Sequence, residues 1–183
     1  MTLMHRRGYG DVGVQELCDS AGIKKGAFYH HFPSKQALTL VMIEEMERQI
    51  HARILEPAFA RDVPPVERLR RFFRRSHAVQ VEAKEKTGCV LGCPFGNLAL
   101  ELGNREDEVR RALEGVFKRI IAVFHAALQE ALDTGELQGI NPEQTARALL
   151  AFQEGILMMA KTHNDPDLLL GQEEMGLRLC GIR

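Results

Sequence analysis

The stretch from Lys24 to Lys35 carries side chains that could bind nucleic acid. It reads Lys-Lys-Gly-Ala-Phe-Tyr-His-His-Phe-Pro-Ser-Lys, so long cations stand beside two residues with almost no side chain. At the start of a helix, this combination suits a close approach to base edges in the major groove of DNA. Each feature alone is weak, because a surface lysine pair is usually just solvated. Their order along the chain is specific.

A second stretch, at the break between Thr87 and Pro94, could supply a reactive thiol. Pro94 favours the first turn of a helix and so places Cys93 at the N-cap. A helix dipole stabilises a thiolate there and lowers the pKa of a thiol, which makes Cys93 the possible reactive thiol. The alternative is that Cys93 is a small apolar residue packed under the helix start. Cys89 is a weaker candidate.

Composition limits the class of protein. The chain has 183 residues, 45% of them hydrophobic, and a net charge of -1, which suits one compact domain or two small ones. No apolar run approaches the roughly 18 residues that span a bilayer, and no signal segment opens the sequence, so we expect a cytoplasmic protein without a membrane partner. Four scattered cysteines without a CxxC pair predict free thiols and no metal site.

Helical periodicity runs through the chain, and no strand is predicted. Asn141, Pro142 and Gln144 combine a capping residue, a proline at the first helical position and a capping-box glutamine. A helix also starts at Pro94. The remaining helices expected beyond the N-terminal region cover residues 34–55, 66–84, 107–134, 142–163 and 167–179. The predicted fold class is all-α.

Residues 9–35 have the pattern of a helix-turn-helix. Val14, Leu17 and Cys18 mark the inner face of a first short helix, and Lys24 to Phe32 form the second. Between them, Gly22 can adopt the left-handed conformation of the turn, and Ile23 is expected to fill the shared core. Residues 1–35 carry five Lys or Arg against three acidic residues, a modest positive excess.

The second short helix is therefore the predicted recognition helix. Its first residues face base edges, and the aromatic and histidine side chains after them reach phosphate oxygens. Ser34 caps the next helix, whose N-terminus with Lys35 forms an anion site. The candidate DNA contacts, with Gly13 added as a cap of the first motif helix, are Gly13, Lys24, Lys25, Gly26, Ala27, Tyr29, His30, His31 and Lys35.

The same residues carry a family resemblance. Gly8-Tyr9, then Ala21-Gly22, then residues 25–35 follow in the order of the TetR family signature, and the likeness is strong over about the first 55 residues. The resemblance implies that Lys25, Gly26, Ala27, Tyr29, His30 and Lys35 touch DNA. It also implies a DNA-binding domain over residues 1–40 and a helical domain for effector binding and dimerisation over 41–183.

Two features depart from the family pattern. Members of the family have a longer helix ahead of Gly8-Tyr9, whereas only Thr2 to Arg7 represent it here. Either the chain begins upstream of Met1, or the first helix is truncated and the module is less stable. The threonine or serine that often caps the first motif helix is replaced by Val12-Gly13, so Gly13 or Asp11 must cap it. We expect a weaker hold on phosphate at that point.

The stretch from Gly92 to Leu102, GCPFGNLALEL, resembles one branch of the family. Some members of that branch respond to electrophiles or oxidants through a cysteine in this stretch. The resemblance therefore implies the same response for Cys93, if its sulfur is accessible.

A pocket for a largely apolar effector is expected where several helices converge, although residues at such spacing are more often plain core. The candidate lining is Phe72, Phe73, His77, Phe95, Leu98, Phe117, Ile121, Phe124, Phe152, Leu157 and Met158. Polar contacts could come from His77, His125, Glu101, Glu154 and Lys161. The arginines between residues 68 and 75 are assigned no function.

These features predict a homodimer that binds a palindromic or near-palindromic operator. One recognition helix reads few base pairs, and two such helices dock about 34 Å apart. The helices at 107–134 and 142–163 are expected to pair with their symmetry mates, and Ala148, Ala151 and Gly155 permit close contact. A small molecule or electrophile that favours another spacing of the recognition helices would release DNA.

Two other classes of protein were weighed. A thiol enzyme using Cys89 and Cys93 is disfavoured, because the sequence has no thioredoxin-like strand pattern and no nucleophile with a partner base. We therefore expect no enzyme and no cofactor. The second alternative is a dimeric helical protein that binds small molecules and has lost DNA binding through truncation of its first helix.

Overall fold

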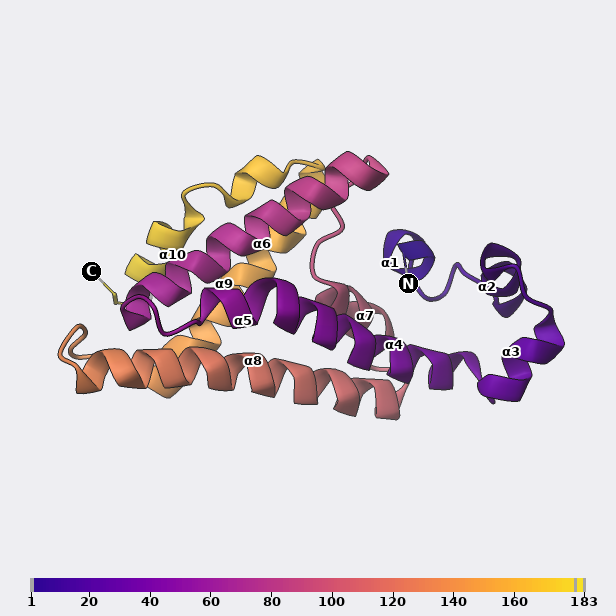
Figure 1. The fold of residues 1–183 in the computed structure, drawn as a ribbon, viewed down its shortest axis with the longest axis horizontal. Helices are drawn as coiled ribbons and strands as arrows, with labels where there is room; N and C mark the ends of the chain where they lie inside the picture. The colour runs from indigo at the N-terminus through magenta and orange to yellow at the C-terminus, as the bar shows by residue number, and fades with distance from the viewer. Residues whose placement is uncertain (1, 180, 183) are drawn as a thin grey trace. The chain divides into compact units, whose positions relative to one another are not determined.

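The computed structural model describes residues 2–179 and 181–182, and all the regular elements in this part of the chain are helices (Figure 1). The predicted all-α class is confirmed. The elements are α1 (Thr2–Arg7), α2 (Val14–Ala21), α3 (Lys25–His31), α4 (Lys35–Ile50), a π-helical turn (His51–Leu55), α5 (Glu56–Ala58), α6 (Pro65–Thr87), α7 (Pro94–Leu102), α8 (Asp107–Asp133), α9 (Pro142–His163), a 3₁₀ turn (Pro166–Leu169) and α10 (Gln172–Leu179).

The chain divides into two compact units. Unit 1 comprises Met1–Arg48 and Pro94–Val116, and unit 2 comprises Gln49–Cys93 and Phe117–Arg183. Unit 1 thus contains α1, α2, α3 and α7 with the first parts of α4 and α8. Unit 2 contains α5, α6, α9 and α10 with the rest of α8. No helix among the described residues is long and apolar enough to cross a membrane.

Local capping explains where the helices begin and end. Ser34 Oγ accepts a hydrogen bond from the backbone nitrogen of Ala37 at 3.0 Å, as expected for the cap of α4. Asn141 caps α9 by accepting from the backbone nitrogen of Gln144 at 3.0 Å. Gly22 ends α2 with φ of 67°, the left-handed conformation predicted for the turn.

Three local predictions were wrong. Ile23 is 43% exposed rather than buried, because the positive φ at Gly22 turns the chain and breaks the helical periodicity. The helix expected over residues 34–55 changes to a π-helical turn at His51–Leu55. The expected final helix is split, because Leu170 is extended and Gly171 has φ of 70° between the 3₁₀ turn and α10.

Unit 2 has an aromatic core. Phe124 is fully buried, and its ring centroid lies 4.7 Å from that of Phe72 and 5.8 Å from that of Phe59. Phe73 continues the cluster, with its centroid 5.6 Å from Phe72 and 6.2 Å from Phe152. Edge contacts of this kind add to the stabilisation from burial alone.

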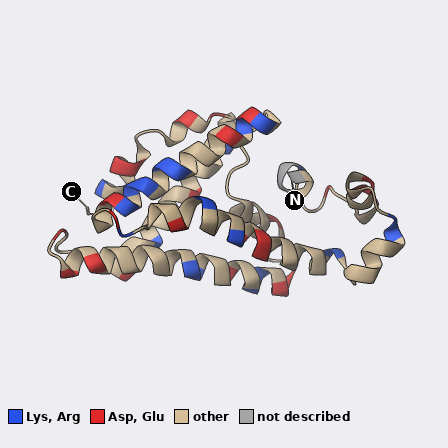
Figure 2. Ribbon diagram, in the orientation of Figure 1, with Lys and Arg blue, Asp and Glu red and all other residues tan. Residues whose placement is uncertain are grey.

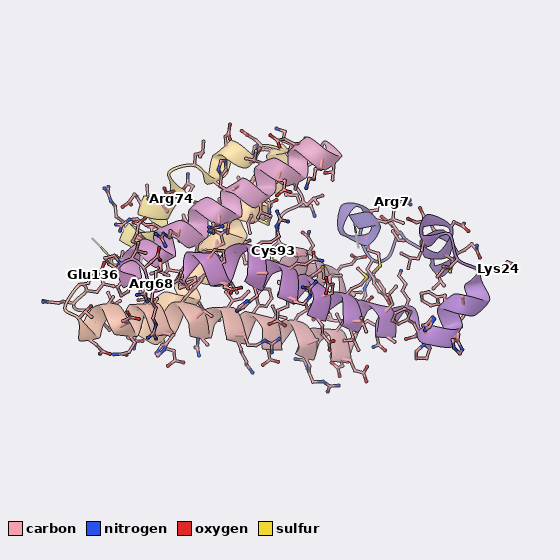
Figure 3. The ribbon with its side chains drawn as sticks, in the orientation of Figure 1. Arg7, Lys24, Arg68, Arg74, Cys93 and Glu136 are labelled. Carbon is pink, nitrogen blue, oxygen red and sulfur yellow. The ribbon has the colours of Figure 1, made fainter. Side chains whose placement is uncertain are left out.

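Four of the five arginines of α6 pair with carboxylates; Figure 2 shows the basic positions along this helix, and Figure 3 labels Arg68 and Arg74. Arg68 is buried and donates two parallel hydrogen bonds to Glu130, at 2.8 and 2.9 Å. This bidentate geometry lowers the pKa of the Glu130 carboxyl. Arg70, Arg71 and Arg74 also form ion pairs, with Glu174, Asp62 and Glu67 as partners.

Candidate functional site

The recognition helix predicted from sequence is α3, and one side of it is held by a single buried residue. Phe28 is 3% exposed, and its ring centroid lies 5.7 Å from that of Phe32. All other residues of α3 are exposed, as is Lys24 at its N-cap; Figure 3 labels Lys24 at this helix start. The exposed candidates are Lys24, Lys25, Gly26, Ala27, Tyr29, His30 and His31.

Two glycines of this region have no internal reason to be glycine. A Cβ added to Gly26 would meet no other atom of the chain within 4 Å, and Gly26 does not have a positive φ. The same space surrounds Gly13, the N-cap of α2, whose φ is -77°. Neither packing nor backbone conformation therefore requires glycine. The open space at Gly26 would allow another molecule to approach the backbone closely, whereas glycine at Gly13 also suits an N-cap.

Gly13 is the observed N-cap of α2, as one of the two predicted alternatives stated. It has no side chain with which to make a capping hydrogen bond. The adjacent backbone amides of α2 are therefore available to an oxygen from outside the chain.

Lys35 has a partner within unit 1. Its ammonium donates a hydrogen bond to the backbone oxygen of Tyr9 and lies 3.8 Å from the centroid of the Tyr9 ring. Burial lowers the pKa of Lys35, an effect that the negative charge of Glu101 partly offsets. The predicted contact of Lys35 with phosphate therefore stays a prediction, and its observed role is to hold α4 to the turn after α1.

Glu101 of α7 clamps the same turn. Its Oε2 accepts from the backbone nitrogen of Tyr9 at 2.7 Å, and its Oε1 accepts from the backbone nitrogen of Gly10. Burial raises the pKa of Tyr9, and Glu106 and Glu101 add to that rise. We refer to this arrangement of Glu101, Tyr9 and Gly10 as the Glu101 clamp.

The sequence suggested Glu101 only as one of several polar contacts of a pocket. The carboxylate instead satisfies two backbone donors about 90 positions earlier in the chain. Helical periodicity could not predict this contact. The Glu101 carboxylate accepts from backbone N–H groups, and nearly every residue of any sequence has such a group.

In unit 2, the loop that ends at Cys93 is fixed at both sides. Gln80 of α6 holds Gly92 through both backbone groups, accepting from the nitrogen at 3.0 Å and donating to the oxygen at 3.3 Å. Asn164, at the end of α9, accepts from the backbone nitrogen of Val90 at 2.7 Å. Asn164 also donates to the oxygen of Gly88 at 3.1 Å. These four hydrogen bonds fix the path of the chain into Cys93.

Cys93 is half-buried and directly precedes α7, so the predicted helix start at Pro94 is confirmed. The side chain packs against an apolar cluster formed by Val90, Leu157, Ala160 and Leu169. Cys89 is exposed and Cys18 is buried, while Cys180 lies outside the described residues.

A carboxyl group contacts the Cys93 thiol. The Cys93 side chain interacts with the Glu154 carboxyl and favours its ionised form, as a hydrogen bond donated by the thiol would. Burial raises the pKa of Glu154, and the interaction with Cys93 opposes that rise. The thiol thus lies beside a proton acceptor with a raised pKa.

Glu154 gives a pH-dependent prediction. Because its pKa is higher in the folded state than in the unfolded state, the folded protein binds more protons in the interval between the two values. Its contribution to stability is therefore complete below the unfolded pKa and is lost as pH rises through the folded pKa. We expect Glu154→Gln to gain stability relative to wild type as pH rises through this window, as measured by urea unfolding. A constant difference across that pH range would contradict the assignment.

The candidate pocket residues do not all fall in one place. Phe72, Phe73, Phe124 and Phe152 are joined by the ring contacts of unit 2, and Leu157 belongs to the apolar cluster beside Cys93. Phe117 and Ile121 of α8 are half-buried in the same unit.

Four other pocket candidates have different surroundings. His77 lies with its Nε2 3.4 Å from Asp167 Oδ1. Phe95 and Leu98 are buried in unit 1. Met158 is 55% exposed on α9, and the structure does not bring it to the aromatic residues. Periodicity could not show this, because it identifies a buried face but not the unit in which that face packs.

The small residues proposed for dimerisation lie along α9. Ala148 and Ala151 are exposed and Gly155 is half-buried. A Cβ added to Gly155 would meet nothing within 4 Å. Ala148, Ala151 and Gly155, together with the exposed Met158 and Met159, give α9 a face of small and apolar side chains.

Comparison with known families matches both parts of the chain. Residues 1–42 match the family described as "Bacterial regulatory proteins, tetR family". Residues 65–170 match "Tetracyclin repressor-like, C-terminal domain". The first match includes α2 and α3, and the second includes Cys93 and Glu154.

Bacterial relatives of the chain carry regulator names. The chain is 35% identical over 165 residues to "Transcriptional regulator AcuR" of Cereibacter sphaeroides, covering 89% of this chain and 73% of the relative. It is 29% identical over 164 residues to "HTH-type transcriptional repressor DhaR" of Mycobacterium sp., covering 89% of this chain and 79% of that protein.

Solved structures agree with these matches. The regulatory protein TetR from Rhodobacter sphaeroides has a TM-score of 0.81 and 33% identity, covering 97% of this chain and 90% of that one. The reduced form of NemR from E. coli shares the fold, with a TM-score of 0.81, 24% identity and the same coverage. These relatives are transcriptional regulators and not enzymes. With both parts of the chain matched, the protein belongs to the TetR family of DNA-binding transcriptional regulators.

Proposed function

We propose that this regulator is a dimeric repressor that is released from its operator when a small molecule or an electrophile acts on unit 2. The observation that carries the proposal is the connection made by α7. This helix begins one residue after Cys93 and ends with the Glu101 clamp on Tyr9 and Gly10. Repression is supported by the repressor names of DhaR and NemR.

The proposed DNA contacts follow from exposure and from the space around two glycines. The start of α3 meets base edges in the major groove, with Gly26 and Ala27 allowing the backbone to come close. We assign phosphate contacts to Tyr29, His30, His31 and Lys35, and a backbone contact to the helix start at Gly13. The DNA-binding module ends near residue 40 in this proposal.

The proposed dimer uses α8 and α9, whose small residues permit close helix contact. The proposed location is the cytoplasm, where the operator lies. The alternative of a protein without DNA binding is not favoured, because the N-terminal family match includes the whole helix-turn-helix.

The proposed response to an electrophile begins at Cys93. When the thiol adds to a double bond such as that of N-ethylmaleimide, a sulfur–carbon bond forms and the thiol proton ends on the neighbouring carbon. Glu154 is placed to receive that proton first, because its carboxyl interacts with the Cys93 side chain. The added group must then find space in the apolar cluster beside Cys93, where interiors are tightly packed.

Alkylation tests this proposal. We expect N-ethylmaleimide to release DNA from the wild type and from Cys89→Ser, and to leave Cys93→Ser bound, as measured by fluorescence anisotropy of a labelled duplex from upstream of the gene. Cys89 is the matched control, because its thiol is more exposed and lies four residues away. All three proteins should carry Cys180→Ser. Equal release from wild type and Cys93→Ser would rule out the thiol response.

A further inference from the structure

The amide of Gln153 is buried without a partner. Its side chain is 2% exposed, yet neither its Nε2 nor its Oε1 has a hydrogen-bond partner in the part of the chain that the structure describes. Leaving such a group unpaired costs stability, so a buried amide without a partner in a native fold requires an explanation.

The buried residues one turn before and one turn after Gln153 on α9 are apolar. Gln153 lies on the buried face of α9, one turn from Leu149 and one turn from Leu157, which are also buried. Its neighbour Phe152 contacts Phe73 and lies against Gly176 of α10, where an added Cβ would come within 2.8 Å of the Phe152 ring. The sequence alone did not mark Gln153, because a glutamine is ordinary on a helix.

A different glutamine of the same unit shows what a satisfied amide looks like. Gln80 is 6% exposed, and both of its polar atoms bond to the backbone of Gly92. Gln80 and Gln153 are thus about equally buried, but only Gln80 has hydrogen-bond partners among the described residues. Fold stability explains Gln80 and does not explain Gln153.

We infer that Gln153 is a binding residue for the effector, and that it recognises a small molecule with an uncharged amide or carbonyl group on an apolar body. This inference rests on the proposed function, because it names the ligand class of the same domain. The amide both donates and accepts, so an amide on the ligand can satisfy both of its atoms. The buried leucines on the same face of α9, Leu149 and Leu157, suit the apolar body.

The charges of unit 2 argue against an anionic ligand. The buried guanidinium of Arg68 is already paired with Glu130. The carboxyl group at the next position, Glu154, is itself in a buried setting that disfavours negative charge. Leu149 and Leu157, one turn from Gln153 on the buried face of α9, offer no counter-ion to a carboxylate, which would therefore bear the cost of desolvation.

Burial of Gln153 also links binding to a change of state. A ligand can reach the amide only when the packing around α9 opens, so it binds the opened state better than the closed one. Differential affinity of this kind is what shifts a regulator between two states.

Benzamide, benzoate and toluene test this inference, because they share a ring and differ in the polar group. We expect benzamide to bind the full-length dimer in calorimetry and to raise its Tm, and benzoate to bind more weakly. Gln153→Met keeps the length of the side chain without its donors and acceptor. This variant should lower the affinity for benzamide by about tenfold or more and leave the affinity for toluene unchanged or higher.

The unliganded variants provide the second readout. Gln153→Met should have a Tm equal to or above that of the wild type, whereas Gln80→Met should have a lower Tm because it breaks two buried hydrogen bonds. Equal benzamide affinity for wild type and Gln153→Met, absence of benzamide binding at millimolar concentration, or a Tm loss as large as that of Gln80→Met would overturn the inference. The proposed function is tested separately, by the release of DNA. It is therefore not contradicted if benzamide does not bind.

Discussion

Replacing Gly26 with glutamate is expected to abolish operator binding while leaving the protein at least as stable as the wild type. Gly26 is the second residue of α3, and a Cβ added there meets no other atom within 4 Å. Glutamate is a better helix former than glycine, and an acidic side chain favours a helix N-terminus, so the helix should gain about 0.5–1 kcal/mol. On DNA, the same side chain would bring bulk and negative charge against base edges and phosphates.

The measurement is fluorescence anisotropy with duplex DNA at several salt concentrations, beside thermal unfolding. We expect a loss of affinity of about 100-fold or more, because a buried like charge costs several kcal/mol at an interface. Gly26→Ala should show a much smaller loss. Ala78→Glu adds the same charge at an exposed position of α6 and should bind DNA like the wild type. Normal DNA binding by Gly26→Glu would show that α3 does not enter the groove.

The Glu101→Ala variant should have the second largest effect. The substitution leaves the backbone nitrogens of Tyr9 and Gly10 without their acceptor, and it removes a negative charge that favours the protonated form of Lys35. A lost hydrogen bond to a charged group costs about 1.5–3 kcal/mol. We expect the Tm to fall by several degrees and operator affinity to fall by at least about tenfold, because the turn between α1 and α2 is no longer held.

Two variants separate the clamp from a general effect of charge. Glu101→Gln keeps one acceptor oxygen and should lie between wild type and Glu101→Ala in both measurements. Glu44→Ala removes an exposed carboxylate from the interior of α4 and should change neither. If Glu101→Ala bound DNA with wild-type affinity, α7 could not act as the link between unit 2 and the DNA-binding module.

Those parts of the fold that depend on local chemistry could be predicted from the sequence. Asn141 and Pro142 set the start of α9, Ser34 capped α4, and Gly22 ended α2, because caps and left-handed turns need only the residues next to them. The π-helical turn after α4 has no comparable local signal. Ile23 was misplaced because a hydrophobic residue after a turn can face either way.

The candidate site was predictable to a smaller extent. Exposure of the α3 residues agrees with the recognition-helix prediction, since an anchoring phenylalanine on one face leaves the other faces open. Glu101 and Gln153 were not predicted as a clamp and a buried orphan amide. Both roles depend on which groups lie opposite in three dimensions, and one sequence contains no record of such pairs.

Directed cleavage of operator DNA tests the central claim most directly, namely that two copies of α3 enter successive major grooves. A DNA-cleaving iron chelate attached to Ala27→Cys, in a protein whose own cysteines are replaced by serine, should cut a duplex from upstream of the gene. The account predicts two clusters of cuts related by a dyad and separated by about one helical turn or a multiple of it. Scattered cuts, or no cuts above those of the untethered chelate, would contradict it.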